Sequence, residues 1–189
     1  MSSQPNRIIY SDKFSDALVA YLIKKYSKVS KRVLGRTILQ KLCYFATSSG
    51  VPLPFRFEMY HYGPFSQEIF ETTQDLLLDQ AIEDKSISEG QSNYVPGRNC
   101  DALLRRFTSE LKQHKGNLDR VANMFSQLDP SQMELVATIH YVHSSHAQWF
   151  KEVPTKEGIV ESVLKVKGQK FSKEFVEHVY AVVRDAKLL

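Results

Sequence analysis

The sequence lacks any long apolar run, and only two of its 189 residues are cysteines. No stretch approaches the roughly 20 consecutive apolar residues that a membrane-spanning helix needs. The N-terminal stretch MSSQPNRIIYSDKF has no uninterrupted apolar region and no small-residue cleavage site, which argues against a secretory leader. Two cysteines cannot form the disulfide framework of a small secreted domain. We therefore expect a reduced, cytoplasmic protein with no membrane partner.

The two cysteines differ in their sequence surroundings. Cys43 lies among apolar residues of an expected helix, where a buried thiol behaves as a small hydrophobic group. Cys100 lies where another helix is expected to begin. A disulfide between the two has little to favour it, but the sequence alone leaves it open.

The motifs that mark common active sites are also missing. The chain has no GxSxG elbow, no GxxxxGK[ST] phosphate loop and no GxGxxG turn. The apolar setting of Cys43 does not lower the pKa of a thiol. His61 follows Phe55, Phe57 and Met59 at a spacing of two, so we expect it to point into the core and not to act as a general acid or base. The sequence therefore predicts no catalytic residue, no cofactor and no enzymatic activity.

Three histidines in the stretch HYVHSSH, His140, His143 and His146, are the best candidates for metal ligands. A spacing of three places successive rings on neighbouring helix positions, where two of them could share one metal ion. However, the run contains no carboxylate or cysteine, and the HExxH arrangement is absent. The other interpretation is packing of the rings beside Trp149 and Phe150 near a helix end. We expect no metal site, and the role of these histidines stays open.

Helical periodicity dominates the chain, with one expected strand and one expected hairpin. The strand covers 55–60, where apolar and polar residues alternate. Gly63-Pro64 should end it and start the next helix, since proline is tolerated in a first helical turn. The stretches AIEDKSIS and SNYVPG predict a short hairpin around a Glu-Gly-Gln turn. We predict a mostly helical α+β fold. Its half 1–97 should be winged-helix-like, with helices and a small three-stranded antiparallel sheet, and should pack on a C-terminal helical half, 98–189.

Charge is distributed unevenly. The segment 24–36 contains six basic residues and no acid, whereas 57–84 contains seven acids and no lysine or arginine. Such asymmetry concerns partners more than fold. The helix expected after Gly63-Pro64 is too acidic to read DNA, because four carboxylates would face the phosphates. The basic segment remains an alternative site for sequence-independent nucleic-acid binding, through Lys24, Lys25, Lys28, Lys31, Arg32 and Arg36.

An ordered set of short motifs resembles a known bacterial family. A helix of the form LQKLxYF is followed by YxYGP and by a helix that opens with FSxE. The matching residues are Gln40, Lys41, Leu42, Tyr44 and Phe45, then Tyr60, Tyr62, Gly63 and Pro64. This order resembles the YwgA family, which is itself similar to the Panacea domain of SocA-like antitoxins and phage-associated proteins. Two C-terminal stretches, 134–142 and 166–179, extend the resemblance.

The resemblance implies a bacterial or mobile-element regulatory protein without established enzymatic chemistry. Panacea relatives act as antitoxins, by contacting a toxin protein or by serving as adaptors. The resemblance therefore implies a toxin or a component of a phage-defence system as the partner. Tyrosines with a charged rim are favoured at protein interfaces. We accordingly predict protein binding through Tyr60, Tyr62, Glu68, Glu71 and Asp75.

Overall fold

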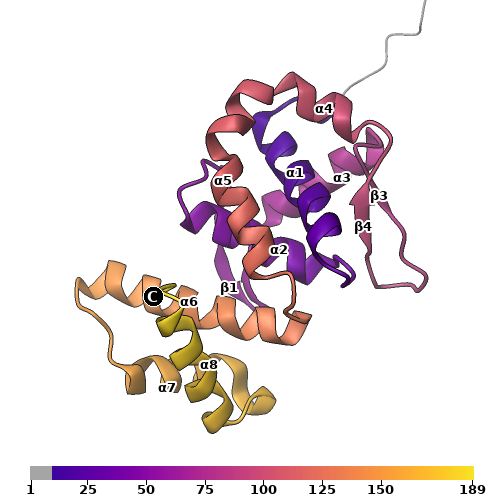
Figure 1. Cartoon of the computed structure of the whole chain (residues 1–189). Coiled ribbons are helices and arrows are strands. Elements are labelled where there is room, and N and C mark those ends of the chain that lie inside the picture. Colours follow the sequence, from indigo (N-terminus) through magenta and orange to yellow (C-terminus); the bar gives the residue numbers. More distant parts are fainter. Residues whose placement is uncertain (1–9) are drawn as a thin grey trace, which may run out of the picture. The chain divides into compact units, whose positions relative to one another are not determined.

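The structure is a computed structural model that describes residues 10–189 (Figure 1). The described part is mostly helical with two small antiparallel sheets, which confirms the predicted α+β class. Its first elements are α1 (Phe14–Val29), α2 (Arg36–Ser48), β1 (Glu58–Tyr60), β2 (Gly63–Phe65), α3 (Gln67–Leu78), β3 (Ile82–Asp84) and β4 (Tyr94–Pro96). They are followed by α4 (Cys100–Arg106), α5 (Thr108–Met124), α6 (Pro130–Phe150), α7 (Lys156–Lys167), the 3-10 turn η1 (Gly168–Lys170) and α8 (Lys173–Asp185).

These elements form two compact units whose boundaries differ from the expected halves 1–97 and 98–189. Of the described residues, unit 1 contains 10–56 and 66–127, and unit 2 contains 57–65 and 128–189. The short segment 57–65 therefore belongs with the C-terminal helices, although it lies far from them in the sequence. The chain passes between the units after Arg56, after Phe65 and after Gln127.

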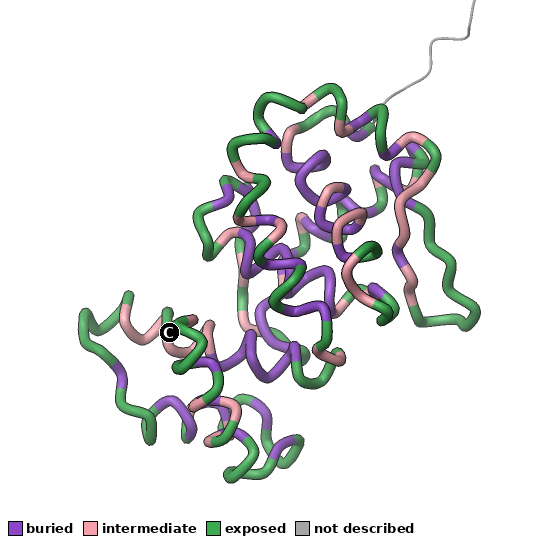
Figure 2. Tube along the Cα trace, viewed as in Figure 1, coloured by how far each residue is buried: buried purple, intermediate pink, exposed green. Residues whose placement is uncertain are grey.

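Unit 1 is built around α1. This helix packs on α2, α3, α4, α5 and β4, and most of its residues from 15 to 23 are buried, whereas its last turn is largely exposed (Figure 2). A second packing contact joins α2 to α5, where the rings of Phe45 and Phe125 stack with their centroids 4.3 Å apart. The cysteines of α2 and α4 also lie in this unit, and both are buried and free. The core of unit 1 thus comes from the apolar stripes that the sequence predicts.

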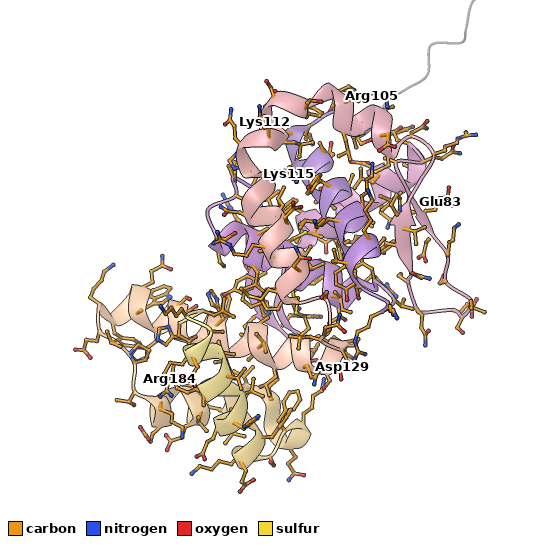
Figure 3. All side chains as sticks on the ribbon, viewed as in Figure 1. Glu83, Arg105, Lys112, Lys115, Asp129 and Arg184 are labelled. Atoms are coloured by element: carbon orange, nitrogen blue, oxygen red, sulfur yellow. The ribbon has the colours of Figure 1, made fainter. Side chains whose placement is uncertain are left out.

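Unit 2 consists of α6, α7 and α8 together with the β1–β2 hairpin. The helix α6 begins with a capping box, in which the Asp129 carboxylate accepts from the Gln132 N–H (2.8 Å) and the Gln132 side chain accepts from the Asp129 N–H (3.0 Å). Asp129 is labelled at this helix start in Figure 3, and Arg184 is labelled near the end of α8. The three helices pack on one another, and α6 also contacts β2. The hairpin is therefore an integral part of this unit.

The sheet arrangement differs from the expected three-stranded sheet. Within residues 10–189, β1 pairs only with β2 and β3 pairs only with β4. The reason is that Gly63-Pro64 does not start a helix but forms β2, opposite Met59 and Tyr60. The positive φ of Gly63, 84°, closes a two-residue turn at His61 and Tyr62. The helix α3 then begins only at Gln67, after Ser66.

A second glycine, Gly97, fixes how the chain leaves the β3–β4 hairpin. A Cβ atom at this position would lie 2.3 Å from the carbonyl oxygen of Gln80 and 2.9 Å from its carbonyl carbon. The Gly97 N–H donates to the Ala81 carbonyl (2.9 Å). This hydrogen bond keeps the backbone of Gly97 close to that of Gln80 and Ala81. Only glycine therefore fits this close approach.

We expect Gly97→Ala to lower the free energy of unfolding of unit 1 by about 2–3 kcal/mol, because backbone must shift to relieve the contact. Denaturant unfolding followed by circular dichroism measures this change. Gly116→Ala is the matched control, since Gly116 lies inside α5 with open space around its Cα. This control should gain about 0.5–1 kcal/mol from helix propensity. Equal stabilities of the two variants would contradict the steric role of Gly97.

Candidate functional site

The YGP segment of unit 2 has an outward aromatic part and an inward Gly-Pro part. Tyr60 ends β1 and Tyr62 lies in the turn, and each is 60% exposed. Gly63 and Pro64 are buried in β2. His61 is exposed in the turn, so the prediction that it points into the core is wrong. The alternation that suggested an inward His61 ends at Tyr60, because the next residue already belongs to the turn.

A charged cluster built on a buried carboxylate lies next to this turn. Glu134 of α6 is 2% exposed, and its Oε2 atom accepts a hydrogen bond from the Lys170 ammonium at 2.7 Å. The Lys167 ammonium lies 3.0 Å from Oε1, in an ion pair without the geometry of a directed hydrogen bond. The side chain of Lys167 is only 2% exposed. One buried carboxylate thus holds two lysines, at the end of α7 and in η1. We call Glu134, Lys167 and Lys170 the Glu134 cluster.

The Glu134 cluster contacts the hairpin turn directly. The Lys167 ammonium donates to the carbonyl oxygen of His61 at 2.9 Å. The Lys170 ammonium lies 5.0 Å from the centre of the Tyr62 ring, at cation–π distance. A third contact is made just before the hairpin, where the Tyr141 hydroxyl donates to the Phe57 carbonyl oxygen at 3.3 Å. The exposed turn is therefore fixed at its backbone and at one of its two tyrosine rings.

The electrostatics of the cluster depend on all three members. Burial lowers the pKa of Lys167, while the neighbouring Glu134 carboxylate opposes this effect. Two lysines share one carboxylate, so the cluster has a surplus positive charge when its members are ionised. That charge lies beside the Tyr62 ring, whose face attracts cations. The arrangement suits a rigid recognition surface.

The acidic residues predicted to share a surface with the tyrosines lie in the other unit, on α3. Glu71 is exposed and Asp75 is half-buried. The Glu68 carboxylate accepts a hydrogen bond from the Ser66 hydroxyl at 2.5 Å, and this bond is the main reason that the pKa of Glu68 is lowered. The helix α3 also exposes Phe70 and Leu78, which were not among the predicted binding residues.

Gln40 of the LQKL motif positions the start of α3. Its side-chain amide donates to the Ser66 carbonyl, and its side-chain oxygen accepts from the Ser66 N–H, both at 2.9 Å. Both partners are buried. The first motif of the resemblance thus holds the residue that follows the YGPF segment, so the two motifs are in direct contact at the start of α3.

Acids from other elements neutralise part of the positive charge of the basic segment 24–36 in the folded chain. Lys24 forms an ion pair with Asp101, whose pKa is lowered by the hydrogen bond from this lysine. Lys25 lies 3.4 Å from Asp119, which also pairs with Lys115, one of the α5 lysines labelled in Figure 3. These acids come from α4 and α5, so a count along the segment cannot reveal them.

The remaining cations of the segment separate into two kinds. The guanidinium groups of Arg32 and Arg36 donate to the carbonyl oxygens of Gln127 (2.8 Å) and Gly90 (2.7 Å). Lys28 and Lys31 are exposed, and neither makes an ion pair within the part of the chain that the structure describes. Of the six predicted nucleic-acid-binding cations, Lys24 and Lys25 are thus paired with acids, whereas Lys28, Lys31, Arg32 and Arg36 have no ion-pair partner among residues 10–189.

The histidines and cysteines show no arrangement typical of a catalytic or metal site. Burial, and to a smaller extent the neighbouring His143, lowers the pKa of His140 to about 4. The ring of His146 packs on Phe150 at 4.6 Å. No group of three or more histidine, cysteine or acidic residues within 10–189 is placed to hold a metal ion. Burial raises the pKa of the Cys100 thiol to about 11, and it raises that of Cys43 further.

The expected packing of the histidines near Trp149 and Phe150 occurs only in part. Phe150 packs on His146, but Trp149 is 81% exposed at the end of α6. Phe150 and Val153 are also exposed. The end of α6 therefore presents apolar side chains that helical periodicity alone would assign to the interior.

Comparisons with known proteins agree with part of the sequence resemblance. No protein-family model matches the chain, so the link to the Panacea domain rests on the short motifs alone. Among residues 10–189, no helix combines the length and apolar character needed to cross a bilayer. The chain is similar to the uncharacterized protein YwgA of Bacillus subtilis (strain 168), with 26% identity over 129 residues that cover 64% of this chain and 75% of YwgA.

Proposed function

We propose that this protein is a non-enzymatic regulatory or adaptor protein that binds another protein through the β1–β2 turn. The observation that carries the proposal is that two exposed tyrosines lie at a turn whose backbone is held by the buried Lys167 ammonium. Exposed tyrosines lose little conformational entropy on binding and offer both apolar and hydrogen-bonding surface. A fixed backbone lowers the entropic cost further. The turn is therefore suited to protein recognition.

The exposed face of α3 supplies a second protein-binding surface. It combines the carboxylates of Glu71 and Asp75 with the exposed side chains of Phe70 and Leu78. Apolar residues beside charged ones are the usual composition of an interface core and its rim. Because the turn and α3 belong to different units, each surface can be tested separately.

The chemistry and the similarity to YwgA support the remaining parts of this proposal. The buried thiols of Cys43 and Cys100 are poor nucleophiles at neutral pH, since their pKa values are raised. The YwgA similarity and the YxYGP motif favour a bacterial cytoplasmic protein. We propose a toxin–antitoxin or phage-defence setting, with a toxin or defence component as the partner.

Site-specific photo-crosslinking in the organism that encodes the chain tests the proposal. A photoreactive phenylalanine analogue at Tyr60 or Tyr62 should give one discrete covalent protein adduct. The matched control is Ile87, which is fully exposed between β3 and β4 and carries no predicted role. The adduct formed from position 60 should disappear when Tyr62→Ala is added. Adduct patterns at 60 and 62 that equal the pattern at 87 would overturn the proposal.

A further inference from the structure

A hollow in unit 1 gathers polar and basic side chains that the proposed protein-binding function does not use. It measures about 220 Å³ and is formed by two segments that are far apart in the sequence. One segment runs from the last turn of α1 into the connection to α2, and the other is Asn93 with the first two residues of β4. Its lining residues are Ser27, Ser30, Lys31, Arg32, Val33, Leu34, Asn93, Tyr94 and Val95.

We propose that this hollow binds a small ligand through a phosphate group. The first reason is where the unpaired positive charge of the basic segment lies. Lys24 and Lys25 are paired with carboxylates, and Arg36 donates to a backbone carbonyl outside the hollow. Lys31 and Arg32 line the hollow, and within residues 10–189 neither has a carboxylate partner. Of the four cations of the segment without a carboxylate partner, Lys31 and Arg32 therefore line the hollow, and Lys28 and Arg36 lie outside its lining.

The second reason is that the hollow is pre-formed. The Arg32 Nε atom donates to the Gln127 carbonyl at 2.8 Å, which orients the guanidinium while leaving its two terminal nitrogens for a ligand. The Arg32 N–H donates to the Ser30 hydroxyl, which itself donates to the Ser126 carbonyl. The chain around the two cations is thus held before any ligand arrives. An oriented guanidinium recognises phosphate oxygens in pairs.

The opposite wall of the hollow is fixed by the β3–β4 hairpin. The Tyr94 N–H donates to the Leu34 carbonyl at 2.9 Å and ties β4 to the α1–α2 connection. Two acids of β3 lie opposite lining residues of β4, Asp84 opposite Tyr94 and Glu83 opposite Val95. The Asp84 carboxylate accepts from the N–H groups of Ser86 and Asn93, and the Glu83 carboxylate pairs with Lys85 at 3.7 Å. Asp84 weakens the local positive potential but leaves the two cations without an ion-pair partner.

The size and lining of the hollow define the ligand class. A volume near 220 Å³ is below the roughly 300 Å³ at which drug-sized pockets begin, so it suits a phosphate with a sugar-sized group attached. The side chains of Val33 and Leu34 provide apolar contact, and Asn93 and Ser27 provide polar groups for hydroxyls. The expected ligand is a small phosphomonoester such as a sugar phosphate.

Titration of the full chain with ribose 5-phosphate, monitored by NMR of backbone amides, tests this inference. We expect saturable shifts confined to 30–34 and 93–95, and about tenfold weaker binding in Lys31→Ala and in Arg32→Ala. Lys31 is exposed and makes no ion pair within residues 10–189, so its replacement leaves the structure intact even if Arg32→Ala disturbs the Gln127 contact. Ribose without phosphate should produce no shift.

Lys28→Ala is the matched control, because Lys28 is an exposed lysine of the same segment that does not line the hollow. It should weaken ribose 5-phosphate binding less than about threefold, as expected for a distant screened charge. Three results would overturn the inference: equal losses in Lys28→Ala and Lys31→Ala, shifts spread over lysines of both units, or binding of oligonucleotides without any binding of ribose 5-phosphate. Because the readout is ligand binding in unit 1, its failure leaves the protein-binding proposal unaffected.

Discussion

Replacing Glu134 with glutamine is expected to lower the free energy of unfolding of unit 2 by about 3–5 kcal/mol. The change removes the only carboxylate within 4.0 Å of Lys167 among the described residues, while the Lys167 ammonium stays buried. A buried charge without its partner loses its Coulomb stabilisation but still lacks full hydration. The Lys170 ammonium loses its charged partner at the same time, because the glutamine amide keeps one oxygen but no negative charge. Local amide exchange in the β1–β2 turn should increase, because Lys167 also holds the His61 carbonyl.

Hydrogen exchange measured by mass spectrometry separates this effect from any change in unit 1. Amides of the buried part of α6, 133–139, should lose protection, while those of α1 serve as an internal reference. Glu161→Gln is the matched control, since Glu161 is an exposed acid of α7, and its effect should stay within about 0.5 kcal/mol. The double variant Glu134→Leu with Lys167→Met should recover much of the loss, because apolar side chains of similar size need no charged partner. Unchanged protection in Glu134→Gln would show that the cluster does not hold unit 2 together.

The helices were predictable because their signals are local. Asp129 and Gln132 form a capping box at the start of α6, and Ser172 caps α8 directly before an amphipathic run. Such signals need only the identities of residues within one or two turns. The mostly helical α+β class follows from them.

The Glu134 cluster was not predicted, although the sequence contains a signal for it. Lys167 falls on the apolar stripe of α7, after Ile159, Val160 and Val163, where a charged residue requires a buried partner. Which acid supplies that partner depends on how α6, α7 and η1 pack, and a local pattern does not contain this information. The same reason explains the overestimated charge of the basic segment, since Asp101 and Asp119 approach it only in the folded chain.

The β1–β2 hairpin could not be predicted for a different reason, because its sequence is compatible with two local structures. The sequence YHYGPF permits either a strand followed by a helix start or a tight hairpin, because proline is tolerated both at a helix start and in an edge strand. The packing of β2 on α6 favours the hairpin. A segment from the first third of the chain thus joins the C-terminal unit, which no boundary based on composition would indicate.

Replacing Asp79 with alanine is expected to lower the free energy of unfolding of unit 1 by about 3–4 kcal/mol. Asp79 follows α3 and is 6% exposed. One of its carboxylate oxygens accepts from the N–H groups of Tyr10 (2.9 Å) and Ser11 (2.7 Å) and from the Ser11 hydroxyl (2.5 Å). Alanine leaves the donors of Ser11 buried without this acceptor, and hydrogen bonds to a charged group contribute more than neutral ones. Denaturant unfolding, together with faster amide exchange at the start of α1, measures the loss.

The variant Asp84→Ala tests whether burial or hydrogen bonding causes the loss of stability expected in Asp79→Ala. Asp84 also accepts two backbone N–H bonds, from Ser86 (3.0 Å) and Asn93 (2.8 Å), but it is exposed, so water replaces the lost carboxylate. Its replacement should therefore cost less than about 1 kcal/mol. If the exposed Asp84, with two of these bonds against three for Asp79, destabilised the protein as much as Asp79 on replacement, burial would not set the cost. A larger loss in Asp79→Ala means that this carboxylate anchors the chain before α1 to the end of α3. It thereby connects two helices that are separated in the sequence by α2 and by the β1–β2 hairpin of unit 2.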